Sequence, residues 1–405
     1  MREAPGRFVK PSFLPLYFLA FTGDLLDSLL IVACVLVGTR EGLSGAYTGA
    51  LAAAYGATYA FSPALLGRVS DRIGRKNSLL VAAGGFTCIA ITLLLFHSNF
   101  WVLIAGECGV GILYGLWWCS IEAYISENAT PASHQAKMNN FCISWSMGYM
   151  LGPFLGNILS GMDPIVSFWI LLLVPAANMV VIALAIPVRH GVPNAHHEPE
   201  KASESVVDAQ LGIKNIALAS AILVFAVFSY AFAKSFFISL FNDVAQSPKY
   251  DLNMTFVQVA ILQLAFGMAR TITFIFQNRI KSTVIFTRVA LALAVSLTTF
   301  LYAVTRSFTA YIFLFIAMGV FTGLLYTMTL ELLMQINRAA KGKTAGFFEA
   351  SIGLGTFLSP VVGGAVLQVT GQAMTTFFVI AVVSTAFACV SLGIYALFAR
   401  AERKT

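Results

Sequence analysis

Apolar runs of roughly 20 residues recur along the whole chain, separated by short polar breaks. A helix of about 20 apolar residues is long enough to cross a hydrocarbon core of about 30 Å. The breaks mark off twelve candidate spans, at residues 13–38, 43–66, 77–96, 100–126, 138–160, 165–186, 214–240, 252–276, 283–304, 308–334, 344–369 and 373–398. The pattern predicts an all-α polytopic membrane protein with twelve transmembrane helices.

The first run resembles a secretory signal, because basic residues precede it. Its apolar stretch continues to about Gly38, however, and no small-residue cleavage site interrupts it. A spanning helix is therefore the better interpretation of residues 13–38.

The shortage of charged residues extends over the whole chain, in which 58% of residues are hydrophobic and 11% are charged. Soluble domains carry about 25% charged residues, so this chain is expected to lie in lipid. The six cysteines fall in apolar runs without a CxxC pair, which favours buried apolar residues over disulfides or metal ligands. His196 and His197 are better interpreted as a pair in an exposed loop than as metal ligands, so we expect no metal and no cofactor.

Lys and Arg are divided unevenly between alternate loops. With the N-terminus in the cytoplasm, 20 of the 25 fall in cytoplasmic segments, and only Arg40, Lys249 and Arg306 fall outside. The remaining two, Lys234 and Arg270, lie within spans. This asymmetry follows the positive-inside rule and places both termini in the cytoplasm. It also accounts for the net charge of +7 without nucleic acid as a partner.

The longest polar stretch connects the sixth and seventh spans and is rich in Pro, Glu, Ser and His. Such a composition is typical of a linker. We therefore expect an N-terminal six-helix bundle at residues 1–186, a cytoplasmic linker at 187–213 and a C-terminal six-helix bundle at 214–405.

Two short segments recur at a single offset. Residues 152–156 (GPFLG) resemble residues 359–363 (SPVVG), and residues 71–73 (DRI) resemble residues 278–280 (NRI). Both pairs are 207 residues apart, since 153 plus 207 is 360 and 72 plus 207 is 279. The match predicts two like bundles related by a pseudo-two-fold axis along the membrane normal.

Residues 67–76 (GRVSDRIGRK) stand between the second and third spans. They resemble the G-x-x-x-D-R-x-G-R-[RK] loop of the major facilitator superfamily. The match is complete at the positions that the motif specifies, which are Gly67, Asp71, Arg72, Gly74, Arg75 and Lys76. The resemblance implies the major facilitator fold, in which this loop locks the two bundles together on the cytoplasmic side in the outward-facing state. A basic loop alone would explain the arginines but not Asp71 or the glycines.

The fourth span ends in YISE at residues 124–127, which resembles the acidic end of that span in the superfamily. The resemblance implies that Glu127 pairs with basic residues of the loop.

The fifth span contains GYMLGPFLGN at residues 148–157, which is similar to the g-x-x-x-G-P-x-x-G-G motif of the drug:proton antiporter branch. Its matching residues are Gly148, Gly152, Pro153 and Gly156, and Asn157 replaces the final glycine. Close helix packing would also explain small residues and a proline here. In the fourth span, Glu107 occupies the place of an arginine implicated in proton coupling in that branch, so the branch's coupling scheme does not carry over whole.

Ionisable side chains within the spans are the main functional candidates. Each costs at least ~2.5–3.5 kcal/mol at the bilayer centre and usually faces a cavity. The candidates for proton coupling or substrate binding are Asp24, Asp27, Glu107, Glu122, Lys234, Arg270, Glu331 and Glu349. An inner structural ion network is the alternative for Glu122, Arg270, Glu331 and Glu349. Trp145 and Tyr149 are candidate aromatic residues of the cavity, although packing is the commoner role of such residues.

Asp24 and Asp27 are three residues apart and share one helix face. Two carboxylates so close do not both ionise easily, which suits a proton carrier or a receptor for a cationic solute. A structural hydrogen-bonding role is the alternative. Lys234 is the repeat counterpart of Asp27, since 27 plus 207 is 234. We hypothesise that Asp27 and Lys234 form a salt bridge across the cavity that protonation makes or breaks.

These features favour a secondary active transporter that works by alternating access and exports a small organic or amphipathic solute in exchange for protons. Proton-coupled import of a nutrient or metabolite is the alternative. No nucleophile–base set or phosphate-binding glycine loop is evident in the sequence, which argues against an enzyme. A non-transporting sensor and a channel stay open. We expect a monomer in the plasma membrane whose partners are a small-molecule substrate and the lipid bilayer.

Overall fold

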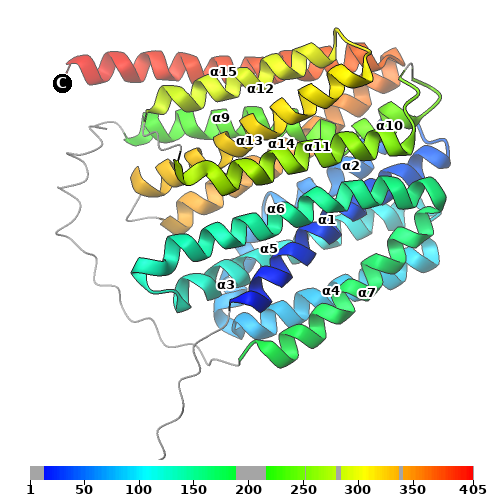
Figure 1. Ribbon diagram of the computed structural model, residues 1–405, viewed down its shortest axis with the longest axis horizontal. Helices are drawn as coiled ribbons and strands as arrows, with labels where there is room; N and C mark the ends of the chain where they lie inside the picture. The colour runs from blue at the N-terminus through cyan, green and yellow to red at the C-terminus, as the bar shows by residue number, and fades with distance from the viewer. Residues whose placement is uncertain (1–12, 188–215, 251, 280–283, 337–340, 405) are drawn as a thin grey trace, which may run out of the picture.

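The computed structural model describes residues 13–187, 216–250, 252–279, 284–336 and 341–404, and the regular elements of these residues are helices. The first half of the chain contains α1 (Leu14–Arg40), α2 (Gly45–Tyr59), α3 (Ser62–Ile73), α4 (Arg75–Phe96), α5 (Phe100–Asn128), α6 (Pro131–Met162) and α7 (Pro164–Ala185). The second half contains α9 (Ile216–Ile238), α10 (Phe241–Gln246), α11 (Phe256–Phe276), the 3₁₀-helix η1 (Gln277–Arg279), α12 (Ile285–Tyr302), α13 (Phe308–Ile336), α14 (Lys341–Thr370) and α15 (Ala373–Lys404). The helices run side by side, and the two halves lie against each other (Figure 1).

The helices correspond to the twelve predicted spans, with two of the spans interrupted. The second span is divided into α2 and α3 at Ala60 and Phe61, just before Pro63, which has no N–H to donate. The seventh, predicted at 214–240, is interrupted at its end, where α9 stops at Ile238 and the short helix α10 begins at Phe241, beyond the predicted bound. Ten helices of the described residues are long and apolar enough to cross a membrane. The second and fifth spans fall below that threshold because α2 and α3 are each short and α6 is comparatively polar.

The predicted linker at 187–213 falls, apart from its first residue, outside the described part of the chain. The helices on either side of this gap are α1 to α7 and α9 to α15.

The internal repeat is visible in how the helices pack. Within the first half α1 packs on α6, and within the second half α9 packs on α14. Between the halves α2 packs on α14, and α11 packs on α6. Helices related by the 207-residue offset thus make equivalent contacts, as a pseudo-two-fold axis requires.

Equivalent glycines make the two intra-bundle contacts close. A Cβ atom at Gly148 would meet the backbone of Phe21 and Leu25 in α1, and one at Gly355 would lie 2.8 Å from Ala231 Cβ and Phe232 N in α9. Gly148 and Gly355 are 207 residues apart, as are Leu25 and Phe232. Glycine therefore lets the same pair of backbones approach in both halves.

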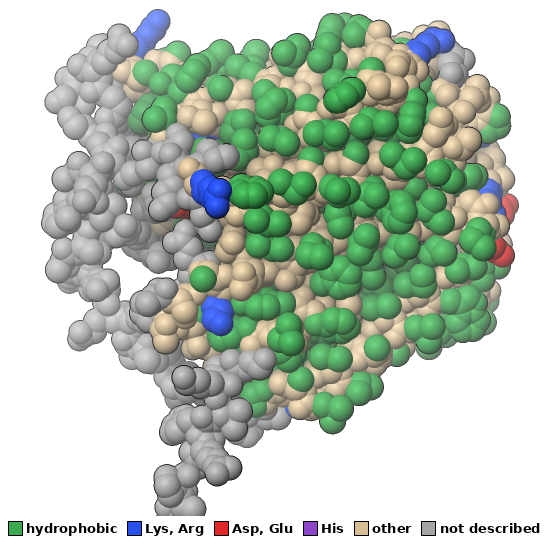
Figure 2. All heavy atoms as spheres, viewed as in Figure 1, with side chains coloured by type: hydrophobic (Ala, Val, Ile, Leu, Met, Phe, Trp, Pro, Cys, Tyr) green, Lys and Arg blue, Asp and Glu red, His purple; other side chains and the backbone are tan. Residues whose placement is uncertain are grey.

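Hydrophobic side chains cover the flank of the molecule, and the charged side chains in view gather at its two ends (Figure 2). Large apolar residues such as Leu173, Val180 and Phe313 are more than half exposed on this surface. Water would penalise so much exposed apolar area, whereas hydrocarbon does not. The surface is that of a protein surrounded by lipid.

The two ends of the molecule are named by their connections. The loop end carries the α3–α4 connection at Gly74, and the far end carries the α1–α2 connection at residues 41–44. At the far end, α2 and α14 approach so closely that a Cβ at Gly49 would lie 2.6 Å from Pro360 O and 2.8 Å from Gly364 Cα.

Substitution of Gly49 by alanine should separate α2 from α14. Since the neighbouring atoms belong to backbone, they cannot move aside, and we expect Gly49→Ala to lower the free energy of unfolding by about 1–3 kcal/mol. Gly84→Ala is the matched control, because nothing lies within 4 Å of its added Cβ. Thermal unfolding of the purified variants checks this, and equal melting temperatures for the two would contradict the packing described here.

Candidate functional site

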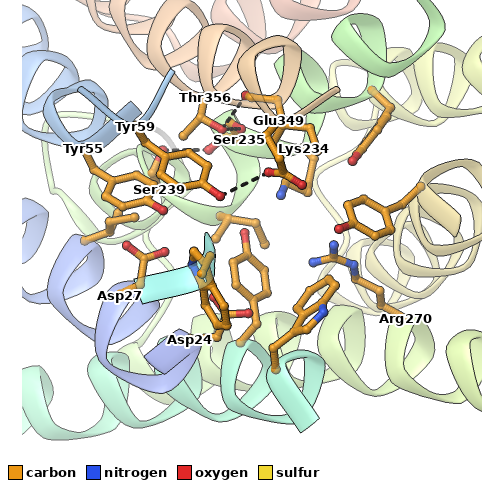
Figure 3. A pocket seen from close by; sticks show the side chains of 18 of the residues that line it. Asp24, Asp27, Tyr55, Tyr59, Lys234, Ser235, Ser239, Arg270, Glu349 and Thr356 are labelled. Carbon is orange, nitrogen blue, oxygen red and sulfur yellow. Dashed lines mark hydrogen bonds between the residues drawn. The ribbon is translucent and has the colours of Figure 1, made fainter. Parts of the chain in front are cut away.

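A cavity lies between the two halves and is lined by residues of both (Figure 3). Its empty volume is about 880 Å³, which includes space open to solvent. Its walls come from α1, α2, α5 and α6 on one side and from α9, α11, α13 and α14 on the other. The aromatic residues in these walls are Tyr55, Tyr59, Trp118, Phe141, Trp145, Tyr149, Tyr230 and Tyr326.

The structure brings six of the eight predicted ionisable residues together in the wall of this cavity. They are Asp24, Asp27, Glu122, Lys234, Arg270 and Glu349. Each comes from a helix that reaches the interface of the halves, and each avoids lipid by facing the cavity. Trp145 and Tyr149 also line it, as the sequence suggested.

Asp24 and Asp27 lie in α1, which is buried along most of its length by the helices around it. The side chain of Asp27 is 5% exposed, and its Oδ1 atom has no hydrogen-bond partner among the described residues. Lys234 faces the same cavity from α9, but no ion pair joins it to Asp27 in this conformation. The predicted salt bridge is thus open here, with both partners in the cavity and both groups nearly excluded from solvent.

Both cations of the cavity lie over aromatic rings. The Lys234 Nζ atom is 5.1 Å from the centroid of Tyr149, and the Arg270 guanidinium carbon is 5.2 Å from the same centroid. The guanidinium carbon is also 4.7 Å from the centroid of Trp145. A ring face attracts a cation electrostatically, so these rings stabilise two charges that lack a carboxylate contact.

Glu349 connects the two halves. Tyr59 in α2 donates a hydrogen bond from its hydroxyl to Glu349 Oε2 in α14, at 3.1 Å. Figure 3 shows this bond crossing the cavity wall near Lys234. A change in the charge of Glu349 therefore acts directly on a contact between the bundles.

Two predicted site residues lie outside the cavity lining. Glu107 in α5 is fully buried, and neither of its carboxylate oxygens has a hydrogen-bond partner in the described part of the chain. It lies inside the first bundle, near the Cys34 thiol of α1. Glu331 is exposed on the surface of α13, where it interacts with Arg288 of α12. The position of these two residues within apolar runs therefore did not predict whether their side chains face the cavity.

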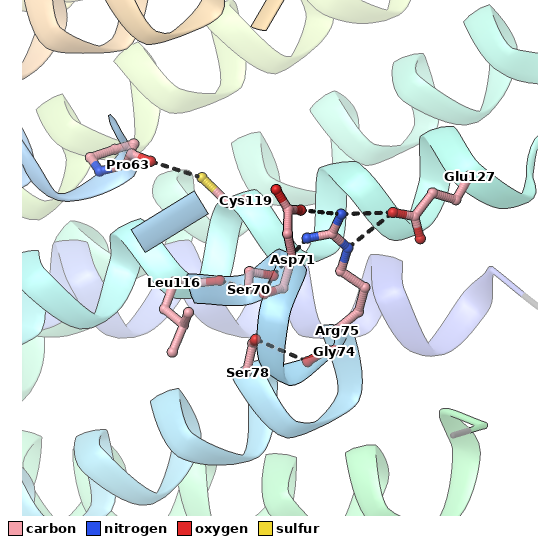
Figure 4. Close-up of polar contacts among 10 residues, drawn as sticks. Pro63, Ser70, Asp71, Gly74, Arg75, Ser78, Leu116, Cys119 and Glu127 are labelled. Carbon is pink, nitrogen blue, oxygen red and sulfur yellow. Dashed lines mark hydrogen bonds and ion pairs between the residues drawn. The ribbon is translucent and has the colours of Figure 1, made fainter. Parts of the chain in front are cut away.

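The signature segment, predicted as a loop between spans, comprises the last turns of α3, a tight turn at Gly74 and the start of α4 (Figure 4). Gly74 has φ of 85°, which is a conformation that favours glycine. Arg75 Nη2 lies 2.6 Å from Asp71 Oδ1 and 2.7 Å from Glu127 Oε1, which confirms the predicted pairing of Glu127 with the loop. Lys76 Nζ donates to Ala183 O at 2.7 Å. The loop is therefore tied to α5 and α7 of its own bundle in this conformation.

The glycines of the fifth span lie against α1. A Cβ at Gly152 would meet Ser28 Oγ and lie 2.7 Å from Leu25 O, and one at Gly156 would lie 2.9 Å from Val32 Cγ1. Pro153 lies within α6, between these contacts. These contacts support the packing interpretation of the motif.

A polar seal at the far end was missed by sequence reasoning. Asp243 in α10 is 2% exposed and accepts hydrogen bonds from Thr39 Oγ1 and Thr48 Oγ1 of the other half, both at 2.8 Å. Asn157 Nδ2 donates to Asn242 Oδ1 at 2.9 Å in the same layer. Asp243 lies beyond the seventh predicted span, which ends at residue 240. Thr39 on α1, Thr48 on α2 and Asn157 on α6 are polar residues in or beside other predicted spans. Nothing in the sequence indicates that they would contact α10.

Nearby, Lys249 Nζ donates to the carbonyl oxygens of Gly42 and Leu43, at 2.7 and 2.8 Å. The contacts of Asp243, Asn157 and Lys249 all join the first half to the second at the far end. The cavity is thus closed on that side in this conformation.

Two bundles related by a pseudo-two-fold axis, with a polar cavity between them closed at one end, define a multi-pass membrane transporter. A model of the Major Facilitator Superfamily matches residues 16–335. The chain belongs to this superfamily.

Curated relatives match over short stretches. The tetracycline resistance protein, class B, of Escherichia coli is 28% identical over 135 residues, which is 33% of this chain and 33% of that protein. Efflux pump azaK of Aspergillus niger is 26% identical over 122 residues, which is 30% of this chain and 26% of that protein. The chain thus aligns with only about a quarter to a third of the length of these relatives.

Solved structures match over nearly the whole chain. The nucleoside transporter NupG has a TM-score of 0.70 at 17% identity and covers 94% of this chain and 98% of its own. A bacterial homolog of the human lysosomal transporter Spinster, in an inward-facing and occupied conformation, has a TM-score of 0.69 at 13% identity and covers 96% of each chain. At these identities the similarity shows the fold.

Removal of the Asp243 carboxylate should loosen the far end. Because a hydrogen bond to a charged group contributes about 1.5–3 kcal/mol, we expect Asp243→Ala to raise the population open at the far end by about tenfold. The reporter is Val35→Cys, a fully buried position of α1 that packs with residues of the second half. Its maleimide labelling rate is measured in a background from which the six native cysteines are removed.

The matched control is Asp163→Ala, which removes an exposed carboxylate that caps α7 at the same end. Its labelling rate should equal that of the parent. Equal rates for Asp243→Ala and Asp163→Ala would show that Asp243 does not hold the far end closed.

Proposed function

We propose that this transporter exports a small organic or amphipathic solute in exchange for protons. The observation that carries the proposal is the convergence of four carboxyl groups on the cavity between the bundles, those of Asp24, Asp27, Glu122 and Glu349. A cationic or partly cationic solute and protons would compete for these groups, and competition for one site is what couples their movements in opposite directions. The efflux pump and tetracycline resistance relatives support export.

Proton-coupled import of a nutrient or metabolite is the alternative. The two cations of the cavity, Lys234 and Arg270, favour this alternative because an anionic solute would bind to them. Protonation of the carboxylates would strengthen that binding by removing negative charge from the cavity. The fold similarity to a nucleoside transporter agrees with a metabolite as substrate.

The proposal includes an orientation. The loop end, with its Arg and Lys residues, faces the cytoplasm, and the far end faces the outside of the plasma membrane. In that orientation the conformation described here is closed to the outside by Asp243 and its partners. Alternating access then requires that this seal breaks while the loop end closes.

Transport into proteoliposomes under an imposed pH gradient tests the direction of coupling. The solute is first found by a thermal-shift screen of the purified protein against a compound library. Antiport predicts that the solute accumulates in the compartment from which protons leave. Accumulation in the compartment that protons enter would replace antiport by symport.

Neutralisation of the α1 carboxylates should uncouple the solute from protons. We expect Asp24→Asn and Asp27→Asn each to reduce pH-driven accumulation by about tenfold or more, while exchange of labelled for unlabelled solute continues, because exchange needs no net proton movement. Glu331→Gln is the control, since its carboxylate is exposed and outside the cavity. Full pH-driven accumulation in both α1 variants would exclude these residues as proton carriers.

The open salt bridge between Asp27 and Lys234 gives a separate test. We expect Asp27→Lys and Lys234→Asp each to abolish transport, because each leaves like charges in a cavity of low dielectric. The double charge swap should recover part of the activity if the two groups pair in another conformation of the cycle. A double variant as inactive as the single ones would argue against the bridge.

A further inference from the structure

Arg270 lines the cavity from α11 and is only 3% exposed. A guanidinium has five N–H donors, and one so buried is ordinarily paired with a carboxylate. Here no ion pair holds Arg270 within the described residues, and its Nε atom has no hydrogen-bond partner there. Arg270 is therefore a buried cation that the described residues leave without a carboxylate partner.

Four aromatic rings surround this guanidinium and are termed the aromatic cage: Trp145, Tyr149, Phe274 and Tyr326. Their centroids lie 4.7, 5.2, 5.4 and 5.8 Å from its central carbon, respectively. Ring faces stabilise the charge but do not accept the hydrogen bonds of its N–H edge. Figure 3 shows the guanidinium directed into the cavity, where a solute would meet that edge.

The geometry of the N–H donors of Arg270 determines which chemical group of a solute can bind to them. The guanidinium is planar, and its paired N–H groups match the two oxygens of a carboxylate. Three rings of the cage, Trp145, Tyr149 and Tyr326, also line the cavity, where an aromatic ring of a solute would pack against them. An aromatic carboxylate therefore fits both parts of this corner.

The charges that face Arg270 define the rest of the solute. Asp24 and Asp27 of α1, Glu122 of α5 and Glu349 of α14 line the same cavity, together with the second cation, Lys234. A purely anionic solute would face four carboxyl groups, whereas a basic nitrogen on the same molecule would meet them favourably. We propose that Arg270 and the aromatic cage form an oxyanion subsite for amphoteric aromatic solutes, whose basic group lies toward Asp24 and Asp27. This substrate class rests on the proposed function of the cavity as a transport site.

Three indole probes that differ only in charge test the subsite: tryptamine (a cation), tryptophan (a zwitterion) and indole-propionate (an anion). Binding of each labelled probe is measured by scintillation proximity to the purified protein. We expect tryptophan to bind about tenfold more tightly than either of the others, because a hydrogen bond to a charged group contributes at least about a factor of ten. Tryptophan that binds no better than tryptamine to the unaltered protein would overturn the proposal.

The variants separate recognition from folding. Arg270→Gln should reduce tryptophan binding to the level of tryptamine and leave tryptamine within about twofold, while Arg270→Lys, which keeps the charge but loses the planar fork, should fall between. Arg279→Gln removes an exposed arginine that lies over Phe276 in the same segment and should change none of the three affinities. An equal loss for all three probes in Arg270→Gln would show that Arg270 serves only to balance the cavity's charge or to maintain its structure.

Failure of this inference is distinguishable from failure of the proposed function. If Arg270→Gln removes the preference for tryptophan but no probe moves in response to a pH gradient, the subsite stands and the proton coupling is wrong. If pH-driven movement persists and Arg270→Gln leaves the order of affinities unchanged, the coupling stands and the subsite is wrong.

Discussion

The cost of placing an ionisable side chain in hydrocarbon determines how this chain is arranged. Water is absent around the helices, so each charged group must reach the ends of the molecule or a space that excludes lipid. Figure 2 shows charge at both ends of an apolar flank. Six of the groups that do not reach the ends line the cavity between the halves, whereas Glu107 is buried inside the first bundle. The cavity therefore holds most of the charge that the fold keeps away from lipid.

The walls of the cavity depend on close backbone contacts that only small residues allow. Gly148 and Gly152 bring α6 against α1, and Gly355 brings α14 against α9. These contacts hold each bundle as a unit, whereas the contacts between bundles combine glycine packing with the hydrogen bonds of Asp243 and Glu349. Polar contacts are exchanged more easily than interlocked backbones, so motion between bundles is favoured over motion within them.

The spans, the internal repeat and the loop could be predicted from the sequence. Each is recognised from short stretches of residues: the length of the apolar runs, two short segments that recur at an offset of 207 residues, and the loop motif. The resemblance of the loop implied that Glu127 pairs with its basic residues, and Arg75 is the residue that does so. The side-chain directions of Glu107 and Glu331 were not predictable, because an apolar run around a charge does not say which neighbour the charge will face. The role of Asp243 could not be predicted, because its partners, Thr39 and Thr48, lie in the other half of the chain. Their contact with Asp243 depends on how the two bundles pack.

The charges of the cavity also constrain how a proton and a solute can affect one another. Asp27 and Lys234 line one cavity without an ion pair between them, and both are nearly excluded from solvent, so the field of each acts on the other through a medium of low dielectric. Protonation of Asp27 would remove one negative charge from the cavity. The positive potential of the remaining cations, Arg270 included, would then be less compensated. For a solute that carries both a basic group and a carboxylate, this change would weaken the binding of the basic group and strengthen the binding of the carboxylate. Protonation would then change the orientation in which such a solute binds as well as its affinity, which lets a single cavity bind it on one side of the membrane and release it on the other.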